Sequence, residues 1–73
     1  MNEVDSLIKE FNGFVERKEK AEKWFDDPKT TDSDRELMTP ELLKVCNRLV
    51  GISKELESLG YKVHSKAFWE GIQ

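Results

Sequence analysis

The sequence has few of the residues that reinforce a small domain covalently or through a metal. It contains one cysteine, Cys46, so no disulfide can form within the chain. The one histidine, His64, has no partner at the spacing of a zinc site. We therefore expect neither a metal nor another cofactor. A single core of 73 residues rarely supplies more than ~3–5 kcal/mol of stability without such reinforcement. Association with another chain is the remaining source of stability.

Long apolar runs and an excess of basic residues are also missing. No run approaches the ~20 apolar residues that cross a bilayer, and Met1–Asp5 is acidic where a secretory signal peptide is basic. With a single thiol, these absences predict a cytoplasmic protein with no membrane association. The net charge is −3, and the sequence has no basic patch of the kind that nucleic-acid-binding proteins carry. Nucleic acid is therefore not expected as a partner.

Sequence motifs of enzymes are missing as well. The chain has no glycine-rich phosphate loop, no GxSxG and no HExxH. The acids that begin at Asp32 alternate as in a calcium loop, but Leu37 and Leu43 stand where an EF-hand needs glycine and a bidentate acid. Cys46 lies among apolar residues, where a thiol behaves as a small hydrophobic group. We predict that the protein is not an enzyme.

The most informative pattern that is present is a helical repeat over residues 40–59. Thr39 can cap this helix, and Pro40 suits its first position, where the missing N–H is not needed. Gly60 can take the left-handed conformation that ends a helix, with Tyr61 folding back as the accompanying apolar contact. The apolar residues alternate steps of three and four, which places them on one helix face: Leu42, Val45, Leu49, Ile52, Leu56 and Leu59.

Residues 2–27 are predicted to form the first long helix, with an apolar stripe that only Lys18 interrupts. Asn12-Gly13 is a turn-favouring dipeptide, so a break at this point is an alternative. The stripe continues in phase beyond it, which favours an unbroken helix. Pro28 ends the helix, because the residue before a proline is disfavoured in the α conformation. The stripe consists of Val4, Leu7, Phe11, Phe14, Ala21 and Phe25.

A linker over residues 28–38 joins the two long helices. Within it, residues 34–38 can form one helical turn, because Ser33 and Glu36 match a capping box. Two long helices with a connection of this length lie antiparallel. The predicted fold is therefore an all-α helical hairpin with a short C-terminal helix, in a single domain that covers residues 1–73.

The two helical glycines, Gly13 and Gly51, are predicted to lie at nearly the same level of this hairpin. Glycine inside a helix costs about 1 kcal/mol relative to alanine. The pair therefore indicates a close approach of the two helices, a bulky neighbour such as Phe11 or Phe14 resting there, or a coincidence.

The tail over residues 61–73 is expected to fold back onto the N-terminal half of the first helix, because Gly60 lies at that end of the hairpin. Ser65 can cap a short helix over residues 66–71. Large apolar side chains dominate the energy of many binding surfaces. Trp24 and Trp69 suit either the core or a binding surface. The residues that we predict to bind a protein partner are Trp24, Tyr61, Phe68, Trp69 and Ile72.

A second apolar seam, rotated by one residue from the first, runs along the helix at Leu43, Cys46 and Val50. A helix that is apolar over so wide an arc is usually buried on two sides. This seam predicts self-association into a homodimer, with four long helices in one bundle. The predicted function is a protein–protein interaction module, such as an adaptor, inhibitor or regulatory subunit. The alternatives are a transcription-linked DNA-binding module that uses residues 33–59 and a purely structural assembly unit.

Overall fold

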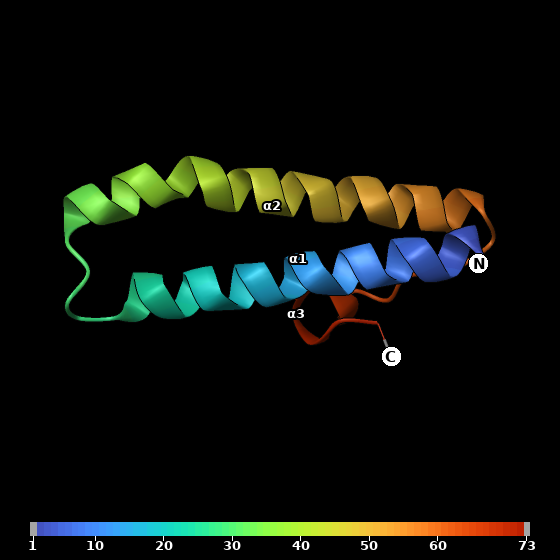
Figure 1. The fold of residues 1–73 in the computed structure, drawn as a ribbon, viewed down its shortest axis with the longest axis horizontal. Coiled ribbons are helices and arrows are strands. Elements are labelled where there is room, and N and C mark those ends of the chain that lie inside the picture. The colour runs from blue at the N-terminus through green and yellow to red at the C-terminus, as the bar shows by residue number, and fades with distance from the viewer. Residues whose placement is uncertain (1, 73) are drawn as a thin grey trace.

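A computed structural model describes residues 2–72, and it shows an all-α chain (Figure 1). Helix α1 spans Glu3–Asp26, α2 spans Asp32–Ser58 and α3 spans Ala67–Glu70, with no strand among the described residues. The two long helices lie side by side and antiparallel, and the longest dimension is 42 Å. That is close to the length of a 27-residue helix at ~1.5 Å per residue. The prediction of a helical hairpin with a short third helix is confirmed.

Helix α1 runs without a break through the Asn12-Gly13 dipeptide. The Asn2 side chain caps its first turn by accepting a hydrogen bond from the Val4 N–H at 3.1 Å. The helix ends at Asp26, in front of the Asp27-Pro28 step that the sequence identified. The alternative of a break at Asn12-Gly13 is therefore wrong, and apolar residues on both sides of the dipeptide belong to or pack against one core cluster.

The C-terminal end of α1 is held by residues that follow it. The Thr30 hydroxyl donates a hydrogen bond to the Trp24 carbonyl at 2.6 Å. The Arg35 Nε group donates another to the Phe25 carbonyl at 3.0 Å. These two bonds satisfy carbonyl groups that have no partner inside the helix. They also fix the loop that turns the chain toward α2, in which Thr30 is buried.

The start of α2 differs from the prediction by eight residues. The helix begins at Asp32, and its cap is Thr31, whose hydroxyl accepts a hydrogen bond from the Asp34 N–H at 3.2 Å. Asp34 in turn accepts from the Thr31 N–H, which completes a capping box. The predicted linker over residues 28–38 is therefore too long, and the helical turn predicted there is part of α2.

Pro40 lies inside α2 and is not its first residue, and Thr39 is not a cap. An interior proline removes one hydrogen bond and bends the helix. The carbonyl group that loses its partner belongs to Glu36, and both Glu36 and Pro40 are exposed. The Thr39 hydroxyl donates to the Arg35 carbonyl at 2.8 Å. In Figure 1 the axis of α2 changes direction in this region, with its convex side away from α1.

The C-terminal end of α2 is the one that the sequence predicted. Gly60 has φ +90°, and its N–H donates to the Glu57 carbonyl at 3.0 Å. The Tyr61 N–H donates to the Leu56 carbonyl at 2.9 Å. This pair of bonds is a Schellman motif. Tyr61 folds back against the core, which confirms the expected apolar contact.

Helix α3 is shorter than predicted and is not capped by Ser65. Its N-cap is Lys66, which has a helical conformation and forms no side-chain capping bond. A capping side chain needs an extended backbone at the cap. Here the chain enters α3 through a turn, in which the Ala67 N–H donates to the His64 carbonyl at 2.9 Å.

The buried core occupies one half of the hairpin, the half in which both long helices are joined by the tail. Figure 1 shows α3 beside the middle of α1, and the segment that leads to it runs from the N-terminal end of α1. The other half, next to the loop that connects α1 and α2, has no third element over it. None of the helices within residues 2–72 is long and apolar enough to span a membrane. The buried apolar residues are Phe11, Val15, Leu49, Ile52, Leu56 and Ala67.

Gly13 and Gly51 do not mark a close approach of the helices. A methyl group built on either residue meets no other atom within 4 Å, and both residues are exposed. The occurrence of glycine at both positions is therefore a coincidence.

Candidate protein-interaction surfaces

Three of the residues predicted to bind a partner border the core of the described structure. Tyr61, Phe68 and Ile72 are partly buried and pack against the core cluster. The Phe68 ring meets the Phe11 ring edge to face, with centroids 5.5 Å apart and planes at 70°. This confirms that the tail folds back onto the first helix. These side chains are therefore only partly exposed to a partner while the tail is docked.

A side-chain amide on α1 holds the end of the tail. The Asn12 Oδ1 atom accepts a hydrogen bond from the Ile72 N–H at 2.6 Å. Its Nδ2 group donates to the Ile72 carbonyl at 2.8 Å. Asn12 therefore pairs with both backbone groups of Ile72. In the sequence, Asn12 is recognisable only as a turn former, because its partner lies 60 positions away.

Lys18, which interrupts the apolar stripe of α1, also contacts the tail. Its Nζ group lies 3.3 Å from the Phe68 carbonyl and 3.0 Å from the Glu22 carboxylate. A charged residue at a stripe position suggests a specific polar partner, but the sequence does not say which one. The structure shows that the partner is the backbone of α3.

Trp69 is the aromatic residue of the tail that remains open to solvent. Its side chain is 57% exposed. It borders a shallow hollow of about 410 Å³ on α1, which Gly13 and Glu16 also line. Trp69 therefore lies at the surface, outside the cluster that Phe68 joins.

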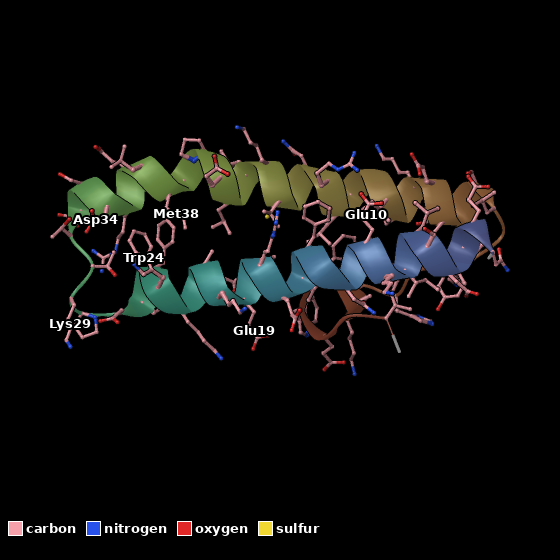
Figure 2. The ribbon with its side chains drawn as sticks, in the orientation of Figure 1. Glu10, Glu19, Trp24, Lys29, Asp34 and Met38 are labelled. Carbon is pink, nitrogen blue, oxygen red and sulfur yellow. The ribbon has the colours of Figure 1, made fainter. Side chains whose placement is uncertain are left out.

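Trp24 lies in a groove between α1 and α2, in the half of the hairpin that the tail does not cover. Its side chain is 37% exposed, and its ring meets the Phe25 ring edge to face at 6.0 Å. Figure 2 labels Trp24 on α1 and Met38 on α2, which lie at the same end of the hairpin, near the connecting loop. The groove has a volume of about 440 Å³. We call it the loop-end groove, and it is lined by Arg17, Lys20, Ala21, Trp24, Met38, Glu41, Leu42 and Val45.

The lining of the loop-end groove is apolar in its centre and charged at its edges. Ala21, Leu42 and Val45 are partly buried, and the charged lining residues are exposed. Arg17 and Lys20 stand on the α1 edge, and Glu41 stands on the α2 edge. Binding sites commonly combine an apolar centre with a few polar groups at the rim.

The second predicted surface, the seam formed by Leu43, Cys46 and Val50, is only partly covered. Leu43 and Val50 are exposed, and Cys46 is partly buried with a free thiol. These residues lie about 100° around α2 from Leu42, Val45 and Leu49, because each follows one of them in the sequence. The seam is therefore accessible in the single chain.

The structure removes the helix–turn–helix arrangement on which the DNA-binding alternative depended. That arrangement needs a turn near residues 39–40 between a short helix and a recognition helix. Residues 32–58 form one continuous helix instead. The described residues also contain no group of three or more histidine, cysteine, aspartate or glutamate side chains placed to hold a metal ion.

Comparison of the chain with protein-family models, with curated proteins and with solved structures finds no match.

Proposed function

We propose that this chain is a small protein–protein interaction module whose binding site is the loop-end groove. One observation supports the proposal most directly. Trp24, Met38 and Leu42 line an open groove between the two long helices, in the half of the hairpin that has no third element over it. Tryptophan is among the residues that contribute most to binding energy at protein interfaces. An exposed tryptophan in an apolar groove is a suitable anchor.

The groove suits a helical segment of a partner. Two antiparallel helices leave a depression along their line of contact, and a third helix fits such a depression with residues at positions i, i+3, i+4 and i+7. The partner helix would complete a three-helix arrangement in the half of the hairpin that lacks a third element. Trp69 lies outside this groove, so we assign it a secondary contact at most.

The test is affinity capture from the source cells with the wild-type chain, Trp24→Ala and a control. Removal of an anchor typically costs at least ~2 kcal/mol of binding energy, or about 30-fold in affinity. The proteins captured by the wild type should therefore be lost with Trp24→Ala. Leu37→Ala is the matched control, because Leu37 is 77% exposed on α2 and does not line the groove. Equal capture by Trp24→Ala and the wild type would contradict the proposed site.

We also propose that the chain forms a homodimer through the seam, with four long helices in the assembly. The accessible seam and the small size of the core support this proposal. Val50→Glu should separate the dimer, because a two-fold axis brings the two introduced charges close together in a buried interface.

Sedimentation equilibrium at tens of micromolar measures this effect. The wild type should sediment at about twice 8.5 kDa and Val50→Glu at about 8.5 kDa. Ser65→Glu adds the same charge at an exposed position outside the seam and should leave the dimer intact. A wild-type chain that sediments only as an 8.5 kDa species would show that the proposal is wrong.

A further inference from the structure

The charges around the loop-end groove are unbalanced. Several basic residues of the hairpin are engaged with neighbouring carboxylates: Lys18 with Glu22, Lys23 with Glu19, and Arg48 with Glu10. Figure 2 labels Glu10 and Glu19, two of these engaged acids. Arg17 and Lys20 are in none of the ion pairs formed among the described residues.

The acid on the opposite edge does not compensate for these two cations. Glu41 lines the α2 side of the groove, and its carboxylate lies 3.7 Å from the Lys44 Nζ group on its own helix. The α1 edge therefore carries two positive charges beside an apolar floor, and the α2 edge carries an acid that already has a partner.

The cations of the α1 edge form a row along the groove. Arg17, Lys20 and Trp24 follow one another at steps of three and four, so they lie along one side of α1 over about two turns. The Arg17 guanidinium lies over the Phe14 ring, 5.7 Å from its centroid, which positions the charged group. Such a guanidinium can form two parallel hydrogen bonds with one carboxylate.

We propose that the occupant of the loop-end groove is an acidic amphipathic helix of a partner protein. This inference rests on the proposed function and adds the chemistry of the partner. Apolar side chains of that helix pack on Ala21, Leu42 and Val45. Aspartate or glutamate residues along one border of its apolar stripe pair with Arg17 and Lys20.

Two synthetic peptides of about 15 residues provide the test, a length at which an isolated helix becomes marginally stable. Both carry the same leucine stripe, and they differ only in its border residues, which are glutamate in one peptide and lysine in the other. Each peptide is labelled, and its binding to the full chain is followed by fluorescence anisotropy. The glutamate peptide should bind about tenfold more tightly at low salt, as two exposed ion pairs allow. The difference should shrink as salt is added, because salt screens exposed charges.

Charge reversal locates the effect. Arg17→Glu combined with Lys20→Glu should reverse the preference between the two peptides. Lys54→Glu combined with Lys62→Glu makes the same change in net charge at exposed positions outside the groove, and it should leave the glutamate peptide preferred.

The other outcomes distinguish this inference from the proposed function. If both peptides bind equally and Trp24→Ala weakens both, the groove binds helices but the acidic partner is wrong. If neither peptide binds, or Trp24→Ala changes nothing, the proposed site fails and the inference fails with it. If the reversal at Arg17 and Lys20 dissociates the homodimer, the occupant is a second copy of the chain, and the acidic partner is again wrong.

Discussion

Replacing Phe11 by alanine is expected to unfold the chain at 25 °C. Phe11 is fully buried, and it joins α1 to the tail through its edge-to-face contact with Phe68. Loss of a buried phenylalanine side chain typically costs ~3–5 kcal/mol, through lost burial and the cavity left behind. That is about the ~3–5 kcal/mol that a core of this size supplies in total. Phe11→Ala should therefore show little helical signal by circular dichroism, where the wild type shows a cooperative transition in urea.

The control for this experiment is Leu37→Ala, which removes a leucine from an exposed position of α2. Its free energy of unfolding should stay within about 0.5 kcal/mol of the wild-type value. A cooperative transition for Phe11→Ala with a loss below about 1 kcal/mol would contradict the assignment of Phe11 to the centre of the core.

Replacing Gly71 by alanine is expected to detach the tail from α1. Gly71 has φ +80° and ψ 172°, a conformation that is almost restricted to glycine. A Cβ atom on this residue would lie 2.9 Å from the Asn12 Oδ1 atom, which holds the Ile72 N–H. The strain and the clash together should cost about 1–3 kcal/mol of stability. The loss cannot exceed the free energy gained when the tail docks, because the tail then detaches. Release of the tail then becomes the lower-energy response.

Hydrogen exchange measures this release directly. The Ile72 amide should lose its protection in Gly71→Ala, while amides in the middle of α2 keep most of theirs. Asn12→Ala should act on the same contact, so its effect should be much smaller in the Gly71→Ala background than in the wild type. Gly13→Ala is the matched glycine control, because space around Gly13 is open and alanine favours the helix by about 1 kcal/mol. Unchanged protection of Ile72 in Gly71→Ala would show that the Asn12–Ile72 contact does not hold the tail.

Features that depend on neighbouring residues in the chain were predictable from the sequence. The spacing of Leu49, Ile52 and Leu56 identified the face of α2 that is buried, since a helix of regular pitch returns these positions to one side. The ending at Gly60 and Tyr61 was also predictable, because a Schellman motif is formed by residues within one turn of each other. The hairpin, and the position of the tail at its N-terminal end, follow from these boundaries.

The start of α2 needed knowledge of the tertiary structure. Thr39 and Pro40 have the composition of a helix start, and the sequence cannot distinguish that start from a tolerated interior proline. The proline is tolerated because its side of α2 faces solvent, while the capping box at Thr31 and the bond from Arg35 to α1 begin the helix earlier. Which side faces solvent is decided only when α2 packs on α1.

Two further features were decided by tertiary structure alone. They are the contacts that hold the tail and the loop-end groove. Asn12 and Lys18 bond to backbone groups 60 and 50 positions away, and no local pattern specifies a partner at such distances. The sequence does determine that Arg17, Lys20 and Trp24 lie in a row on one side of the first helix, since their spacing alone places them there. It becomes the rim of a groove only when α1 packs on α2, because residues of α2 form the opposite edge.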